Sequence, residues 1–501
     1  MGWLEFVTAL AVFFLLHSIP LHPQVRPWLQ TRLGQSGFAL AFSALSLAAL
    51  AWLIGAADLA SHAAIWDWAP WQVHVPLVVM APFCLILASR IVRPNLFAVV
   101  RARQDRSDLV RPSIVRCSCH PLWHGAHRPL FFCAGLCAML APAVWLWPGG
   151  LGTNPFHWHL HELLFGMGGA AVGGYLLTAL PSWTGAGRVG PQSVRSLTLL
   201  WLLARLALPS AGSLPSGLVM TMALAYFAVL ALILTRQLIA ARVWQRLWLV
   251  GAIGGLLLGD AALLAGILRW RDTLFDPLAL VLLFSILISA IGGRAVPAFT
   301  RSWLQTAAPD RNVHDNRVLS SGTLIATAIG GGMALAGQTT AAGTWLILAG
   351  VLQCLRLIGW QSLHTRQYPA LLMLHLAWLW VPMGLILTGI AMRWPQVLPL
   401  GAATHGLTMG AMGTMILAIA GRAAMARQGG RLLAGRGLVT AFALVWLAAL
   451  LRVLTPFVPQ SWTDPVVASA ALWMLGWFIF LWAYRPALLG PLRYPIFSMR
   501  R

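Results

Sequence analysis

Charge is scarce in this chain, and negative charge is the scarcest kind. Only 9% of the 501 residues are charged, and 12 Asp and Glu stand against 34 Lys and Arg. Mean hydropathy is +0.77, and apolar runs of about twenty residues follow one another from end to end. This pattern predicts an all-α, polytopic integral membrane protein, surrounded by membrane lipid. The basic excess then belongs to loops that set topology, and no nucleic-acid partner is expected.

Cysteines are also few, and their positions exclude a disulfide framework. Six occur in the chain, and all but Cys117 and Cys119 lie in apolar runs. The chain contains no GxxxxGK[ST] phosphate loop, so its glycine-rich stretches are interpreted as surfaces that let helices pack closely. The first apolar run lacks a basic leader and a small-residue cleavage site, which favours a retained helix over a removed signal peptide.

The apolar runs predict about fifteen membrane-crossing helices. Lys and Arg gather in alternate loops, whereas residues 148–157, 211–213 and 338–341 carry no charge. The positive-inside rule therefore predicts an N-terminus outside and a C-terminus in the cytoplasm. The helices are expected at 3–20, 37–57, 75–93, 128–147, 158–181, 195–210, 214–235, 246–268, 277–297, 319–337, 342–360, 368–392, 398–421, 433–457 and 464–485.

One long polar segment, residues 101–128, divides these helices into about three and about twelve. We expect a first membrane module at 1–125 and a twelve-helix domain at 126–501. The segment ends in a cluster of possible zinc or copper ligands, although the spacing matches no strong zinc pattern. The cluster comprises Cys117, Cys119, His120, His124 and His127.

The richest site candidate is HWHLHELLFGMGG, which begins at His157. On a helix His157 and His161 lie one turn apart, while His159 is rotated by about 200°, so the three do not readily share one site. Neutral imidazole suits haem iron and copper. Glu162 follows directly, and it either orients an imidazole, relays protons or makes a structural hydrogen bond. We favour His161 as a ligand and regard His157 as a bystander.

The stretch WHLHELLFGMGGAAVGGYLLTALPSWTG resembles the signature of the NnrS family, bacterial membrane proteins associated with nitric oxide metabolism. HRPLFFCAGL, LWLLARLALP, GGRAVPAFTRSWL, LLMLHLAWLWVPMGLIL and THGLTMGAMGTMILAIAGRA agree in order and spacing. The chain departs from the family at Ser182, where NnrS proteins have asparagine, and at ARQGGR, where they often read GHTGR.

The front of the chain is similar to the NnrU family, also of nitric oxide metabolism. FLLHSIPLHPQVRPWLQTRLG, FSALSLAALAWLIGAA and VVMAPFCLILASRIVRPN carry this likeness, with IVRCSCHPLWHG. The rest of an NnrU chain is missing. The sequence therefore indicates a truncated NnrU-like module of three helices fused to an NnrS-like domain of twelve, in a bacterial inner membrane.

The NnrS resemblance implies haem b and copper. We expect His161 and His405 as the first metal ligands, then His159, then His375, which could equally be a hydrogen-bonded core histidine. Which histidine binds which metal stays open.

Five arginines lie inside predicted helices, at positions 205, 294, 356, 422 and 452. Arg205 is the deepest and is expected to pair with haem propionates. Arg294 and Arg422 either do the same or extend to the lipid headgroups. Trp158 and Trp183 either line the haem pocket or belong to the aromatic belt.

We expect Glu162 and Asp260 to deliver protons, although Asp260 would serve equally as an inter-helix hydrogen-bonding group. The predicted function is reduction or detoxification of nitric oxide by an oxidoreductase, with a quinol or another electron donor. The alternative is a non-catalytic nitric oxide sensor or a permease for copper or nitric oxide.

Overall fold

The computed structural model describes residues 2–18, 25–59, 120–146, 154–211, 213–268, 276–428, 431–458, 464–492 and 496–497. Contacts divide the chain into two units, Met1–Val73 and His74–Arg501. The helix expected at 75–93 lies outside the described residues, as do Cys117 and Cys119 of the polar cluster.

The first unit is a pair of helices, α1 (Gly2–Ser18) and α2 (Val25–Leu59). The two helices pack against each other, and the Trp52 indole donates a hydrogen bond of 3.4 Å to Glu5. α2 begins before the expected helix at 37–57 and is kinked at Gly34, whose φ of 72° only glycine adopts without strain.

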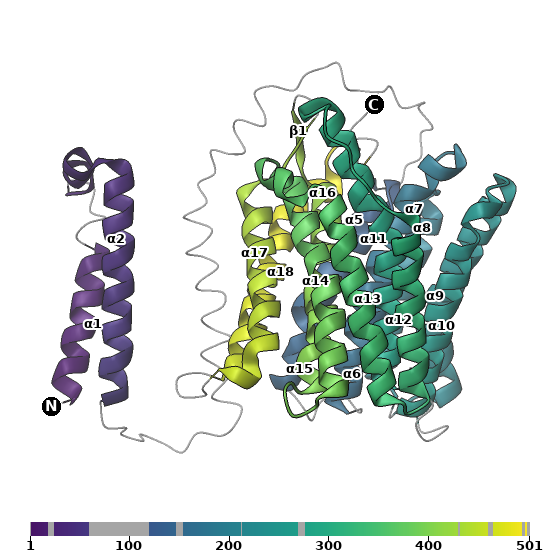
Figure 1. Cartoon of the computed structure of the whole chain (residues 1–501), viewed down its shortest axis with the longest axis horizontal. Helices are drawn as coiled ribbons and strands as arrows, with labels where there is room; N and C mark the ends of the chain where they lie inside the picture. The colour runs from purple at the N-terminus through teal and green to yellow at the C-terminus, as the bar shows by residue number, and fades with distance from the viewer. Residues whose placement is uncertain are drawn as a thin grey trace. The chain divides into compact units, whose positions relative to one another are not determined.

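The second unit is a bundle of roughly parallel helices (Figure 1). Its helices are α5 (His127–Leu140), α6 (Pro155–His161), α7 (Gly169–Thr184), α8 (Pro191–Ala207), α9 (Ser216–Ala240), α10 (Trp248–Ile267), α11 (Pro277–Ala307), α12 (Arg317–Leu335), α13 (Thr339–Gly359), α14 (Pro369–Arg393), α15 (Leu400–His405), α16 (Thr414–Arg422), α17 (Arg436–Leu454) and α18 (Pro465–Leu489). Two wider segments join some of these: η5 (Glu162–Gly168) links α6 to α7, and η8 (Gly406–Gly413) links α15 to α16.

The short segments are minor elements of the second unit. They are η3 (Pro121–His124), η4 (Ala141–Leu146), η6 (Trp244–Arg246), η7 (Ser362–Gln367), η9 (Thr455–Phe457) and the antiparallel strands β1 (Ala426–Gln428) and β2 (Arg431–Leu433). The small hairpin was not predicted. It is held by the Tyr368 hydroxyl, which accepts the Leu432 amide at 2.8 Å.

The all-α polytopic membrane fold is confirmed. Within the described residues, eleven helices are long and apolar enough to cross a membrane. α8, expected as a crossing helix, has only 17 residues and is not among them. The other expected helices from residue 128 onward each have a counterpart in the bundle, with ends shifted by several residues.

Several helices begin with a polar cap that the sequence supplies. The side chains of Asn154, Asp276, Asn316 and Asp464 each accept a backbone N–H of the first turn at 2.8–2.9 Å. In three of these four cases a proline follows the cap, and its fixed φ suits the first helical position. These caps satisfy amides that would otherwise face an apolar environment.

Helices α13 and α14 pack so closely that only glycine fits between them. A Cβ at Gly389 would lie 2.6 Å from the Gly343 carbonyl oxygen, and a Cβ at Gly343 would lie 2.6 Å from the Gly389 oxygen. Small residues that let backbones approach in this way drive helix association in membranes.

We expect Gly389→Ala to lower the free energy of unfolding by about 1–3 kcal/mol, because the added methyl group meets backbone that cannot move aside. Gly332, exposed on α12 with nothing near its Cβ position, provides the matched control. Gly332→Ala should leave stability unchanged or raise it by up to about 1 kcal/mol through helix propensity. Thermal unfolding in detergent measures both, and equal melting temperatures for the two variants would contradict the close packing.

Candidate functional site

His161 and His405, the two histidines favoured as metal ligands, are each followed directly by a π-helical segment. α6 ends at His161 and continues as η5, and α15 ends at His405 and continues as η8. A π turn inserts an extra residue and is frequent at functional sites. The two π segments also approach each other, because a Cβ at Gly168 would lie 3.5 Å from the Met412 sulfur.

A buried chain of charged side chains starts at the first π turn. His161 Nδ1 lies 3.1 Å from Glu162 Oε1, and His161 Nε2 lies 3.1 Å from Asp260 Oδ1 on α10. The exposed fractions of these three residues are 0, 3 and 0%. The structure therefore brings together both residues that the sequence nominates for proton delivery, with one imidazole between their carboxylates.

Arg205 on α8 completes this chain. Its guanidinium donates to Glu162 Oε2 at 2.7 Å and lies over the Trp201 ring at 5.3 Å. Its partner among the described residues is thus a protein carboxylate, and the pairing with propionates stays a prediction. A buried carboxylate needs such a partner, since an isolated charge in an apolar interior is expensive.

Cys137 and Gly166 fit around Glu162. The Cys137 thiol on α5 donates to the Glu162 carbonyl at 3.2 Å. A Cβ at Gly166 would collide with Arg205 and would lie 2.8 Å from the Cys137 sulfur. The glycine of HELLFG is therefore required by the ion pair beside it.

Asp260 is the under-satisfied member of the chain. Its Oδ1 lies 3.1 Å from His161 Nε2, and its Oδ2 has no hydrogen-bond partner among the described residues. A buried carboxylate oxygen without a partner is expensive, so Oδ2 is the position where a further group can bond. This end of the chain is where a proton or a small polar molecule can be held.

His405 and His159 belong to a different group of side chains from His161. The imidazoles of His405 and His159 are within electrostatic range of each other, and both are within range of Arg452 on α17. His405 Nδ1 bonds the Gly401 carbonyl oxygen. The Nδ1 of His159 is buried without a partner in the described chain.

His405 therefore has one ring nitrogen on a backbone carbonyl and the other for a ligand. This is the arrangement that metal-binding histidines adopt, because the carbonyl fixes the tautomer and ring orientation. His161 differs, since carboxylates face both of its nitrogens. His157 is half-buried beside Phe156.

His375 lies apart from these groups, and both of its nitrogens are engaged by hydroxyls. Thr300 Oγ1 is 2.8 Å from Nε2, and Ser362 Oγ is 2.9 Å from Nδ1. Trp360 packs edge-on against the ring. In this arrangement His375 presents no nitrogen to a metal, which matches the hydrogen-bonded core interpretation that the sequence left open.

The remaining candidates are dispersed. Trp158 packs beside a small apolar cluster formed by α8, α9 and α10. Arg422 donates to the carbonyls of Phe497 and Ala370 at 2.7 and 3.1 Å, so its donors are occupied by backbone. Trp183 and Arg294 line a separate cavity, at the opposite end of the α6–α7 helix from His159.

The described residues contain no group of three or more His, Cys, Asp or Glu side chains arranged to hold a metal ion. What they offer is the pair His159 and His405. Sequence reasoning gave no role to Arg452 or Cys137. The only signal for either was an arginine or a cysteine inside an apolar run.

Comparison with known families gives two matches. A family model described as NnrS protein matches residues 121–491, which is more than half of the chain. A second, described as NnrU protein, matches residues 5–146. No curated protein matches. The suspected NnrS family and the NnrU-like front are thereby confirmed.

The ion pair between Arg205 and Glu162 makes a stability prediction. Arg205→Met should lower the free energy of unfolding by about 3 kcal/mol, because it leaves a buried carboxylate unpaired. The double variant Arg205→Met with Glu162→Gln should recover at least half of this loss, since the charge is removed with its partner. Denaturation in detergent measures the cycle.

Arg236, exposed on α9, is the matched control, and Arg236→Met should change stability by less than about 0.5 kcal/mol. A loss for Arg205→Met no larger than this, or no recovery in the double variant, would show that the ion pair contributes little.

Proposed function

This chain belongs to the NnrS family, and we propose that it consumes nitric oxide at a metal centre inside the membrane. Membership of the family makes it a nitric-oxide-related membrane protein. Nitric oxide is small and dissolves in lipid, so a buried site receives it without a polar entrance. The reaction proposed is reduction, in which two molecules of nitric oxide, two electrons and two protons give nitrous oxide and water.

The observation that carries the proposal is the pair His159 and His405, whose imidazoles lie within electrostatic range of each other. His405 has one ring nitrogen held by a backbone carbonyl, and in the part of the chain described here neither histidine is paired with an acid. Two neutral imidazoles suit haem iron, and they also suit copper that takes further ligands from solvent or substrate. These residues fit the haem b and copper that the family resemblance implies.

Such a metal, when bound, would hold nitric oxide and pass on electrons from a donor such as a quinol. The protein side chains would stabilise charge, orient the ligands and supply protons. Arg452 lies near both histidines, and its positive charge would stabilise a propionate or the negative charge that develops on the substrate. Trp145 packs 5.8 Å from the His159 ring and restricts its orientation.

Asp260 and Glu162 would supply the protons. They lie on opposite sides of the His161 ring, which fixes the distance between them. Arg205 holds Glu162 in an ion pair, whereas the contact of Asp260 is with His161 and its Oδ2 has no hydrogen-bond partner in the described residues. Asp260 is therefore the proton donor in this proposal, and Glu162 is the group that replenishes it through His161.

His159→Ala and His405→Ala should each lose the metal, because either change removes one imidazole of the pair. The absorption spectrum, with its Soret band, and metal analysis of the purified protein measure this. His157→Ala, two residues before His159 but without its partners, should retain full metal content. Full retention of haem and copper in both pair variants would remove the proposed centre.

Asp260→Asn should slow nitric oxide consumption by on the order of 100-fold, which is typical for loss of a general acid, while metal content stays the same. An electrode assay with a reductant measures the rate. Asp276→Asn is the matched control, because asparagine caps a helix as well as aspartate does. An unchanged rate in Asp260→Asn would contradict the proton role. Wild-type protein that binds nitric oxide without turnover would instead indicate a sensor.

A further inference from the structure

Two arginines face one cavity at the end of the bundle remote from His159. The cavity has a volume of 370 Å³ and lies between α7, α10 and α11. Arg246, at the end of η6, and Arg294, on α11, both line its wall. Gln245, Trp183 and Trp248 complete its polar and aromatic lining.

Neither arginine has an acidic partner within the described ranges, where the ion pairs are those of Arg205 and Arg356 and of His161. Each instead lies over an indole. Arg246 lies 4.5 Å from the Trp183 ring and Arg294 lies 5.3 Å from the Trp248 ring. Stacking of this kind positions a guanidinium but leaves its in-plane N–H donors unused. The pair is therefore preorganised for an anion.

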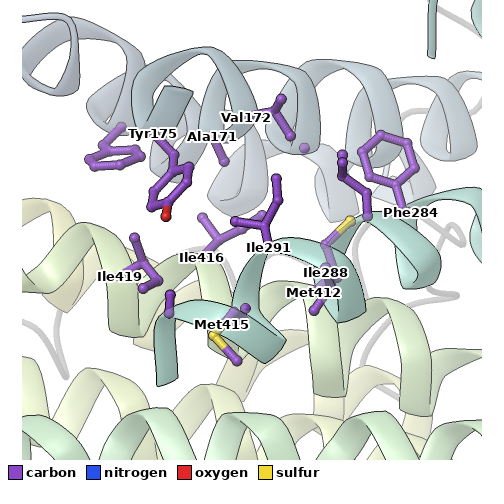
Figure 2. Close-up of a pocket in the computed structure, with 15 residues that line it drawn as sticks. Ala171, Val172, Tyr175, Phe284, Ile288, Ile291, Met412, Met415, Ile416 and Ile419 are labelled. Atoms are coloured by element: carbon purple, nitrogen blue, oxygen red, sulfur yellow. The ribbon is translucent and has the colours of Figure 1, made fainter. Parts of the chain in front are cut away.

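The arginine cavity continues into an apolar one. Tyr175, Ile291 and Ala295 line both. The apolar cavity, of 90 Å³, runs between α7, α11 and the η8–α16 helix. Figure 2 shows its wall as aliphatic, aromatic and thioether side chains, with Phe284 on one side and Tyr175 on the other. No charged side chain lines it.

We propose that the two cavities together bind an anionic phospholipid, with the phosphate between Arg246 and Arg294 and part of an acyl chain in the apolar cavity. The polar part alone would suit free phosphate and the apolar part alone would suit a neutral gas. Their continuity favours a ligand that has both an anionic head and an apolar tail. Loop charges predict that this end is cytoplasmic, and anionic lipids concentrate in the cytoplasmic leaflet.

The test uses the full-length protein, purified in detergent and mixed with vesicles of phosphatidylglycerol or of phosphatidylcholine. Native mass spectrometry counts the lipid retained after detergent exchange. Wild type should retain phosphatidylglycerol at least fivefold more than phosphatidylcholine. The double variant Arg246→Gln with Arg294→Gln should lose this preference, whereas Arg236→Gln, which changes an exposed arginine on α9, should keep it.

A second variant tests the acyl chain. Ala295→Trp fills the junction of the two cavities and leaves both arginines in place, so it should also reduce retention of phosphatidylglycerol. Retention equal to wild type in this variant, or displacement of the lipid by millimolar inorganic phosphate alone, would overturn the apolar half of the site. Equal retention of both lipids by wild type would overturn the whole proposal.

The metal spectrum distinguishes this site from the proposed metal centre. The arginine double variant should keep the Soret band while it loses lipid. If the double variant loses haem but retains as much phosphatidylglycerol as wild type, the two arginines are propionate ligands and the lipid site is overturned. The proposed roles of His159 and His405 would be unaffected.

Discussion

The interior of the bundle is organised around the ion pair that stabilises a buried carboxylate, that of Glu162. Arg205 binds one of its oxygens, and the His161 imidazole lies beside the other. This arrangement constrains its neighbours, since Gly166 must lack a side chain and the Cys137 thiol occupies the Glu162 carbonyl. Three helical segments, α5, η5 and α8, therefore meet at Glu162, and α10 joins them through the contact of Asp260 with His161.

The acidic residues are few enough that most described ones have an identifiable structural task. Asp276 and Asp464 cap helices. Asp315 binds the buried Arg356 at 3.2 Å and accepts the Trp360 indole. Glu162 and Asp260 flank His161. Arginines outnumber these acids, so some of the remaining cations bind backbone carbonyls, as Arg422 does, and others have no acidic partner among the described residues, as at Arg246 and Arg294.

Hydropathy was sufficient to predict the fold class and nearly all the helices of the second unit, because a membrane allows few alternatives to helices. It was not sufficient for the site. Asp260 is 99 residues from His161, and their contact depends on the relative rotation of two helices, which apolar patterning does not determine. Helical geometry predicted that His159 and His161 point in different directions. In the structure His161 contacts Asp260, whereas His159 lies within electrostatic range of Arg452. The pairing of His159 with His405 needed the fold itself.

The two π turns bear on how this chain tolerates changes in length. A π turn holds one residue more than an α-helix of the same extent. Removing one residue within Leu163–Met167 would let η5 close into an α-helix of the same extent, so the histidine end would keep about the same rotation relative to α7. Removing a second residue would rotate that end by about 100° and turn His161 away from Asp260. The extra residue of the π turn thus gives this segment room to lose one residue, but not two.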